Sequence, residues 1–293
     1  MTATARLTTD LKAQVLRLED DLRDRVASDP ELKARWQEEH RQALAAERSA
    51  ASWPQFLDDR LVQAAVAWVL TSVFVRFCED NALVAPVWIA GPPHRRQEAL
   101  DAQLAYFRRH PEDTDREWLL QAVEHLRSLP ATADLVDEHS PLRQISPSGN
   151  AVTALLDFWR AKDDHGELVH DLRDETLSTR FLGDLYQDLS DHAKKTYALL
   201  QTPVFVEEFI LDQTLEPALT ERPLDGFRLI DPTCGSGHFL LGAFDRLVTR
   251  WQEHDQSLSA DEVVTRALVS VLGCSSVRVR FRAEDQATSV RSS

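Results

Sequence analysis

One short stretch of this chain combines residues that can bind a ligand through the backbone. It runs from Asp231 to Gly237 and reads Asp-Pro-Thr-Cys-Gly-Ser-Gly. A short apolar run ending in Leu-Ile precedes it, and an apolar, helix-forming segment follows from Phe239. This order predicts a strand, a tight turn and a helix. The two glycines lack side chains that would keep a ligand away, and the helix start offers free N–H groups to an anionic group.

The whole string resembles the S-adenosylmethionine loop of adenine-specific DNA methyltransferases, whose pattern is Asp-Pro-x-Cys-Gly-Ser-Gly-x-Phe-Leu. The resemblance implies that Asp231 contacts the amino group of the cofactor's methionine. Thr233 and Cys234 would line the turn. Gly235 and Gly237 would let the cofactor approach. An ordinary strand-to-helix turn is the alternative, and it explains the glycines but not the full string. Cys234 is interpreted as a small packed residue, because no activating pattern marks it as a nucleophile.

A second element lies upstream, where the string Gln-Thr-Pro-Val-Phe-Val begins at Gln201. Thr202 is a suitable helix cap and Pro203 a suitable first helical residue. Taken alone, the pattern predicts a capped amphipathic helix that presents one apolar side, made of Val206, Phe209 and Ile210. The same methyltransferases carry a Thr-Pro-x-x-Val element here, which packs over the cofactor from the other side. The resemblance therefore adds Thr202 and Pro203 to the predicted cofactor site.

Together with the segment Arg180–Leu189, the resemblance extends over roughly Thr179 to Leu247. It is closest to the PglX type of methyltransferase, found in phage-growth-limitation and BREX type 2 defence systems, of which the chain would be the N-terminal portion. It implies S-adenosylmethionine as cofactor, no metal, and DNA and other phage-defence proteins as partners of the full-length enzyme. The implied reaction moves a methyl group to the exocyclic amine of adenine.

The base-holding motif of these enzymes, Asn/Asp/Ser-Pro-Pro followed by Tyr, Phe or Trp, does not occur in the chain. Enzymes of this kind flip the base out of the duplex and need that motif to hold it. The only Pro-Pro pair lies between Gly91 and His94, ahead of the cofactor loop. Because it offers neither a side-chain acceptor nor the usual stacking residue, we interpret it as a proline turn. No catalytic residue is assigned, and the chain by itself is predicted to be inactive.

The composition changes after Gly273. Helices are predicted over Phe239–Trp251 and Ser259–Val271, and a second strand ending in a ribose-binding acid should follow them. No acid occupies that place, and Arg and Ser dominate from Cys274 onward. We therefore expect the further strands to be missing and interpret residues 274–293 as an aberrant or disordered tail left by a reading-frame change. A genuine short basic tail is the alternative.

The first half of the chain reads as helices. Leucine and valine recur at helical spacing from Leu7 to Leu22, and Ser28–Glu31 and Asp113–Asp115 have the residues of helix starts. Trp36 and Leu44 are expected to face inward. The longest apolar run, Leu61–Val75, is shorter than the roughly 20 residues of a membrane span. It is therefore predicted to be a buried core helix.

Charge and cysteine content restrict the possible functions. The formal net charge of -15 suits DNA phosphates poorly, so any DNA-binding groove must be local or lie elsewhere. The three cysteines are too widely spaced for a disulfide framework or a CxxC metal site, and they suit a reducing compartment. The N-terminus has no signal-peptide pattern. We expect a cytoplasmic protein without membrane contact.

The predicted fold class is a mainly α N-terminal domain followed by the start of an α/β Rossmann-like S-adenosylmethionine-dependent methyltransferase domain. The predicted parts are a helical domain (1–150), a helical connector (151–200), a partial methyltransferase domain (201–273) and the tail (274–293). A non-catalytic helical interaction module of a defence complex, with a vestigial cofactor loop, is an alternative. A nicotinamide dehydrogenase is a weaker one, because Phe239 stands near the third glycine position of its fingerprint.

Overall fold

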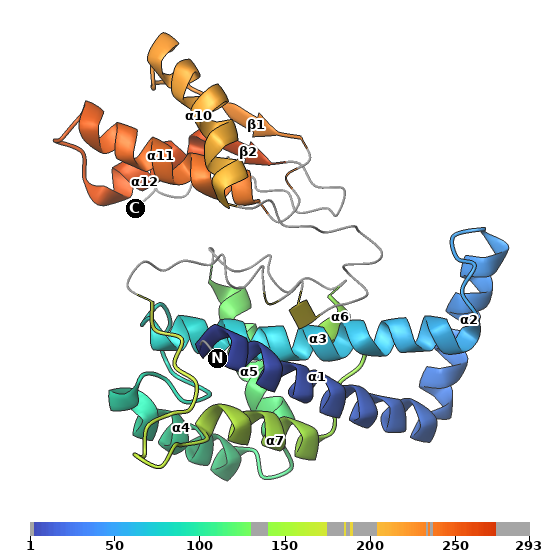
Figure 1. Ribbon diagram of the computed structural model, residues 1–293. Coiled ribbons are helices and arrows are strands. Elements are labelled where there is room, and N and C mark those ends of the chain that lie inside the picture. The colour runs from blue at the N-terminus through green and yellow to red at the C-terminus, as the bar shows by residue number, and fades with distance from the viewer. Residues whose placement is uncertain are drawn as a thin grey trace. The chain divides into compact units, whose positions relative to one another are not determined.

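The computed structural model describes residues 3–129, 140–174, 185, 188–189, 204–232, 234 and 237–273. The chain divides into two compact units, Met1–Ala198 and Leu199–Ser293 (Figure 1). The described part of the first unit is helical, which confirms the expected mainly α N-terminal part. Its helices are α1 (Ala3–Ser28), α2 (Pro30–Ala45), α3 (Trp53–Asp80), the short 3₁₀ helix η1 (Pro93–Arg95), α4 (Arg96–Arg109), α5 (Asp115–Ser128), α6 (Pro141–Gln144) and α7 (Gly149–Arg160).

Helix starts lie where capping residues predict them. The Asp29 carboxylate accepts hydrogen bonds from the N–H groups of Glu31 and Leu32 at 3.1 and 3.0 Å, and Pro30 opens α2. Thr114 and Glu117 form a reciprocal capping box at the start of α5. These side chains satisfy N–H groups that have no partner within the helix, which fixes where each helix begins.

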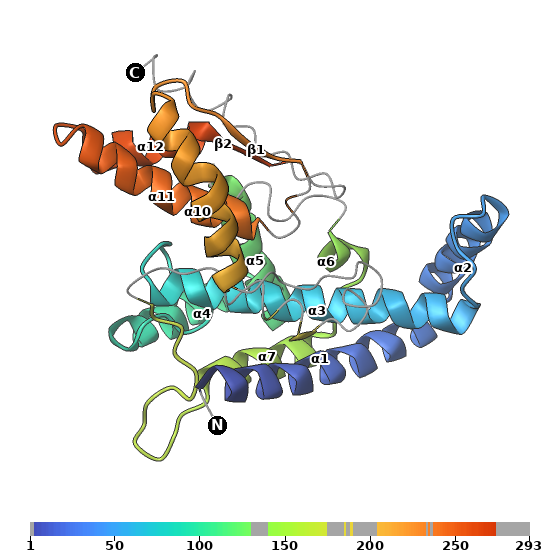
Figure 2. The same cartoon turned by 45° about the horizontal axis from the view of Figure 1, so that its top comes forward.

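Helix α3 is the central helix of the first unit, and α1 packs along it (Figure 2). The regularly spaced leucines of α1 are buried, as is the apolar run of α3, so both predictions are confirmed. By length and composition α3 could also cross a membrane, but 67% of its most apolar window is buried within the unit. Trp36 faces the core as expected. The prediction for Leu44 is wrong, because its side chain is 41% exposed near the end of α2.

The segment beyond residue 140 belongs to the same core. Val152, Leu155, Leu156 and Trp159 of α7 are buried in it, together with Leu172. Indole N–H groups contribute hydrogen bonds, from Trp68 to the Ile145 carbonyl at 3.2 Å and from Trp159 to the Ser72 hydroxyl at 2.9 Å. Residues that the sequence assigns to a connector therefore help to close the helical unit, because they supply apolar surface that α3 and α5 need for burial.

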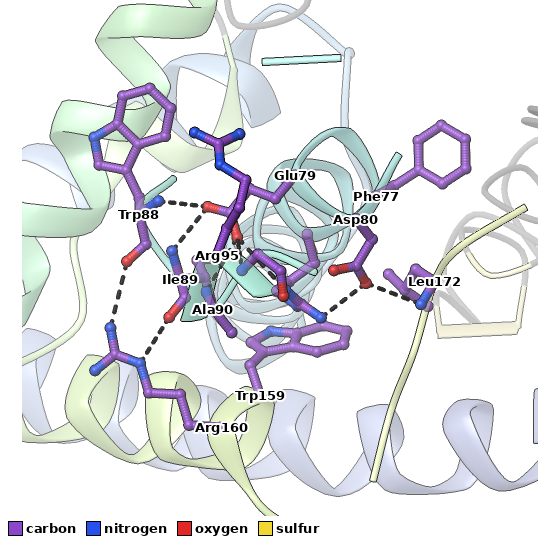
Figure 3. A network of polar contacts seen from close by, with 12 residues as sticks. Phe77, Glu79, Asp80, Trp88, Ile89, Ala90, Arg95, Trp159, Arg160 and Leu172 are labelled. Carbon is purple, nitrogen blue, oxygen red and sulfur yellow. Dashed lines mark hydrogen bonds and ion pairs between the residues drawn. The ribbon is translucent and has the colours of Figure 1, made fainter. Parts of the chain in front are cut away.

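A buried carboxylate organises the loop that follows α3 (Figure 3). The side chain of Glu79 accepts hydrogen bonds from four consecutive backbone N–H groups, those of residues 88 to 91, at 2.6 to 3.1 Å. The carboxylate of Glu79 also forms an ion pair with the buried guanidinium of Arg76, whose Nη1 lies 3.5 Å from Glu79 Oε2. Gly91 adopts a left-handed φ of 64°, and a Cβ there would lie 2.7 Å from Val87 Cγ1. The Pro-Pro pair after it starts the single 3₁₀ turn η1, in which the Arg95 N–H donates to the Pro92 carbonyl at 2.8 Å.

The carbonyl groups of this loop bind the neighbouring helices. Trp118 of α5 donates its indole N–H to the Trp88 carbonyl at 2.9 Å, and Arg160 of α7 donates to the Ile89 carbonyl at 2.7 Å. Burial lowers the pKa of Arg160, but nearby carboxylates oppose this effect. One side chain of α3 thus orders a loop that in turn fixes α5 and α7.

Replacing Glu79 by Ala should destabilise the first unit by more than about 3 kcal/mol, because four buried N–H groups and Arg76 would lose their acceptor. Urea unfolding followed by far-ultraviolet circular dichroism measures the loss. The matched control is Glu112→Ala at an exposed position, which should stay within about 0.5 kcal/mol of the parent protein. Equal stability of the two variants would contradict this account of the loop.

A second prediction concerns Asp80, which follows Glu79 at the end of α3. Burial raises the pKa of its carboxyl from 3.8 to about 6, against the opposing effect of Arg76. Between these two values the folded state binds this proton more readily than the unfolded chain, so falling pH stabilises the fold through this group.

The parent protein should therefore gain stability relative to Asp80→Asn as the pH falls from about 7 to about 5, by at most ~1.4 kcal/mol per pH unit. Urea unfolding of both proteins at several pH values measures the difference. A difference that does not change with pH would show that Asp80 has no raised pKa.

The described part of the second unit contains α10 (Val204–Glu221), β1 (Leu229–Asp231), α11 (His238–His254), α12 (Ala260–Ser270) and β2 (Val271–Gly273). The strands pair in parallel, with Ile230 opposite Leu272 and Asp231 opposite Gly273. Helix α11 packs against α10, α12 and β2, and its Ala243, Leu247 and Trp251 form the core of the unit.

Strand β2 corrects one expectation. The sequence predicted that the helix before it reaches Val271. Instead α12 ends at Ser270, and Val271–Gly273 pairs with β1. Strand pairing prevails here because it satisfies the backbone groups of both short strands. The tail of residues 274–293 lies outside the described residues.

Candidate functional site

The glycine-bearing turn joins β1 to α11 as the sequence predicts. The Gly237 N–H donates to the Cys234 carbonyl at 2.7 Å, which closes a four-residue turn. Gly237 then adopts φ 83° and ψ 15° in the left-handed region, and its carbonyl accepts from the Leu241 N–H at 2.9 Å in the first helical bond of α11. This conformation favours glycine, because any Cβ would strain the backbone there.

Of the predicted site residues, Asp231, Cys234 and Gly237 lie together along this connection. Asp231 is the last residue of β1 and is partly exposed. A Cβ built on Gly237 would have no atom of the described residues within 4 Å, so the space beside this glycine is open on the side of the described chain. The other predicted residues, Thr202, Pro203, Thr233 and Gly235, lie outside the described residues. Their assignment to the site stays a prediction.

Close packing beneath the turn explains the two small residues around it. A Cβ on Gly273 would lie 2.6 Å from Leu240 Cδ1 and 3.1 Å from Cys234 Sγ. The Cys234 side chain therefore packs over the end of β2, next to the first turn of α11. This contact agrees with the interpretation of Cys234 as a packed residue. It also shows why the strand next to the turn ends in glycine.

Helix α10 keeps part of its predicted apolar side exposed. Phe209 and Ile210 are 64% and 38% exposed. The side that is buried in the unit carries Glu207, Leu211 and Leu215. A helical pattern read from apolar residues alone does not identify this buried glutamate.

Glu207 is the residue at this site that sequence reasoning missed. Its side chain is 5% exposed and lies against Gly242, where a Cβ would come within 2.3 Å of Glu207 Oε1. Burial raises the pKa of Asp245 on α11, and the negative charge of Glu207 raises it further. The available signal was Gly242 itself, since a glycine inside a helix often marks a close approach. The contact fixes α10, which follows the Thr202-Pro203 element, against α11, which follows the turn.

Among the described residues, no group of three or more His, Cys, Asp or Glu side chains is arranged to hold a metal ion. The turn offers backbone groups, a carboxylate and an open side, which suit an organic ligand with an amino group and a carboxylate.

Comparison with known proteins relates the chain to the adenine-specific methyltransferases. One relative is the adenine-specific methyltransferase PglX of Streptomyces coelicolor (strain ATCC BAA-471 / A3(2) / M145), which is 47% identical over 276 residues. This match confirms the resemblance to PglX-type enzymes that the motifs indicate. It covers 91% of this chain but only 23% of the relative's length. No protein-family model and no solved structure matches the chain.

A Gly242→Ala substitution tests the contact between α10 and α11. Helix propensity alone would make alanine more stable than glycine by about 1 kcal/mol. The clash with Glu207 and Leu211 should outweigh that gain and destabilise the second unit by about 1–3 kcal/mol. Thermal and urea unfolding of the whole chain, with tryptophan fluorescence as readout, measure the change.

The control is a double-mutant cycle with Glu207→Ala, which removes the carboxylate. In that background Gly242→Ala should become neutral or stabilising. If the two substitutions change the free energy of unfolding additively, the side chain of Glu207 is not the reason why position 242 needs glycine.

Proposed function

We propose that this chain is part of an adenine-specific DNA methyltransferase of a phage-defence system, with S-adenosylmethionine bound at the turn between β1 and α11. The similarity to PglX supports the enzyme class, and the geometry of the turn supports the site. The single observation that carries the cofactor proposal is the left-handed Gly237 beside open space at a helix start, within the full Asp-Pro-x-Cys-Gly-Ser-Gly string. A fold of Rossmann type, of which the parallel β1–β2 pair would be a part, belongs to the same proposal.

Each predicted residue has a distinct role in this proposal. The Asp231 carboxylate would hold the ammonium group of the methionine moiety, and the first N–H groups of α11 would bind its carboxylate. Thr202 and Pro203 would cover the cofactor from the side of α10. Cys234 and Thr233 would shape the turn, and Gly235 and Gly237 would leave room for the cofactor. When bound, S-adenosylmethionine supplies an electrophilic methyl group on a sulfonium centre.

The proposed reaction is direct displacement by the exocyclic amine of a flipped adenine, without a metal or a covalent enzyme intermediate. The chain's own residues would bind and orient the methyl donor. The residues that hold adenine are not assigned to this chain, because the base-holding motif does not occur in it. DNA and other defence proteins are the proposed partners of the full-length enzyme, and the proposed location is the cytoplasm.

The second candidate function is a non-catalytic interaction module of a defence complex. The net charge of -15 and the lack of the base-holding motif favour it for the chain by itself. The two candidates differ in one measurable property, since a functional cofactor loop binds S-adenosylmethionine and a vestigial one does not.

Cofactor binding depends on Asp231 in our proposal. Asp231→Ala and Gly235→Val should each weaken S-adenosylmethionine binding at least tenfold, or about 1.4 kcal/mol. Calorimetry measures the affinity in the chain and in a chimera in which this chain replaces the matched segment of the Streptomyces coelicolor protein. Asp225→Ala, which also removes an exposed aspartate of the second unit, is the matched control and should bind like the parent. Unchanged affinity in both site variants, with the fold intact, would exclude this loop as the cofactor site.

Methyl transfer separates the enzyme from the interaction module. The chain alone should incorporate no radiolabelled methyl into phage DNA, because it lacks the group that holds the flipped base. The chimera should incorporate label, and its Asp231→Ala variant should lose most of that activity. Incorporation by the chain alone above a heat-killed control would contradict our account of the missing motif. An inactive chimera that does not bind the cofactor would favour the interaction module.

A further inference from the structure

A cleft of about 300 Å³ lies at the C-terminal end of α3, in the first unit. Its lining comes from three parts of the first unit: α3, the start of η1, and the segment after α7. These lining residues are Arg76, Asp80, Pro93, Glu167, Leu168, Asp171 and Arg173. Its volume is at the lower end of the range of small-ligand sites, which suits a compact group.

Asp80 carries the argument for a ligand. It is 5% exposed, and its Oδ2 accepts hydrogen bonds from Arg76 Nη2 at 2.8 Å and from the Leu172 N–H at 2.9 Å (Figure 3). Its other oxygen, Oδ1, is buried and has no hydrogen-bond partner. Buried polar atoms are nearly always paired, and an unpaired carboxylate oxygen is costly. No described residue donates a hydrogen bond to Oδ1 in the structure, so this oxygen can accept one from a ligand.

The charges around the cleft favour a positive donor. The guanidinium of Arg173 is held by Asp171, with Nη2 and Oδ2 2.5 Å apart. That of Arg76 lies between the carboxylates of Glu79 and Asp80, although its Nε has no partner. Glu167 is exposed and lines the cleft, and its charge acts on the guanidinium of Arg173 without a direct hydrogen bond between described atoms. Two carboxylates that line the cleft can therefore still accept hydrogen bonds, those of Asp80 and Glu167.

We propose that this cleft binds a compact cation with N–H donors, an ammonium or guanidinium group, between Asp80 Oδ1 and the carboxylate of Glu167. Such a group would complete the hydrogen bonding of Asp80 and neutralise both acids. The same chemistry is carried by a free amine and by the side chain of a lysine or arginine on a partner protein. Every lining residue belongs to the first unit, so the proposed site shares no residue with the proposed cofactor turn.

The test uses the whole chain and small probes. n-Butylammonium chloride supplies a cation with N–H donors, tetramethylammonium chloride a cation without them, and 1-butanol a neutral molecule of similar length. Nα-acetyl-lysine amide represents a protein side chain. Calorimetry and thermal unfolding are measured at constant ionic strength for the parent, Asp80→Asn and Glu167→Gln. Glu112→Gln, which removes the same charge at an exposed position outside the cleft, is the matched control.

We expect n-butylammonium or the lysine derivative to bind saturably. Its affinity should be at least fivefold higher than that of tetramethylammonium or 1-butanol. Tighter binding of the lysine derivative would point to a protein partner, and equal or weaker binding to a free amine. Asp80→Asn and Glu167→Gln should each weaken binding at least fivefold, whereas Glu112→Gln should not.

Asp80 also accepts hydrogen bonds from Arg76 and from the Leu172 N–H, so Asp80→Asn is informative only if the variant folds. If Asp80→Asn does not fold, the result for Glu167→Gln decides. The proposal is overturned if neither amine binds saturably, if tetramethylammonium or 1-butanol binds equally well, or if Glu167→Gln binds like the parent. In those cases Asp80 Oδ1 would be satisfied by water or by a small rotation towards Arg76 Nε.

Discussion

The helical unit depends most on the hydrogen bonds that the buried carboxylate of Glu79 accepts from the loop after α3. Residues 87–90 run through the interior, where each backbone N–H needs an acceptor that no strand or helix supplies. One buried carboxylate accepts from four of the N–H groups in this loop, and the buried Arg76 lies beside it. A buried charge is tolerated only when it is paired and hydrogen-bonded to this extent, so neither the glutamate nor the loop could occupy its place without the other.

The end of α3 extends this polar organisation to the chain beyond α7. Asp80 binds the Leu172 N–H, and Asn81 donates to the Leu172 carbonyl at 2.9 Å and accepts from the Asp174 N–H at 2.8 Å. Consecutive residues at one helix end therefore fix two distant segments, the loop at 88–91 and the segment at 172–174. The cleft beside Asp80 is lined by Pro93, which follows the loop, and by Asp171 and Arg173 at the second of these segments.

The second unit relies on close approach of backbone rather than on buried charge alone. Gly237 permits the left-handed turn, Gly273 leaves room for Cys234 and Leu240, and Gly242 leaves room for Glu207. Each glycine has a separate physical reason. Together they bring the end of β1, the start of α11 and helix α10 to one place, where a ligand could reach the turn through the open side of Gly237.

Local signals in the sequence determined much of this protein. Helical spacing identified the buried leucines of α1 and the apolar run of α3, and capping residues located the starts of α2 and α5. The Asp-Pro-Thr-Cys-Gly-Ser-Gly string predicted a turn between a strand and a helix and the relation to adenine-specific methyltransferases. These features depend on residues close together in the chain, so their physical causes can be read from short segments.

Only the tertiary structure decided the burial of Glu79, the orientation of α10 and the pairing of β2. A glutamate in a sequence reads as solvent-exposed, and Glu79 and Glu207 are buried because distant residues supply N–H groups or space. Val271–Gly273 forms a strand because Leu229–Asp231 lies beside it. Such outcomes depend on partners far along the chain, and no local pattern of apolar residues specifies those partners.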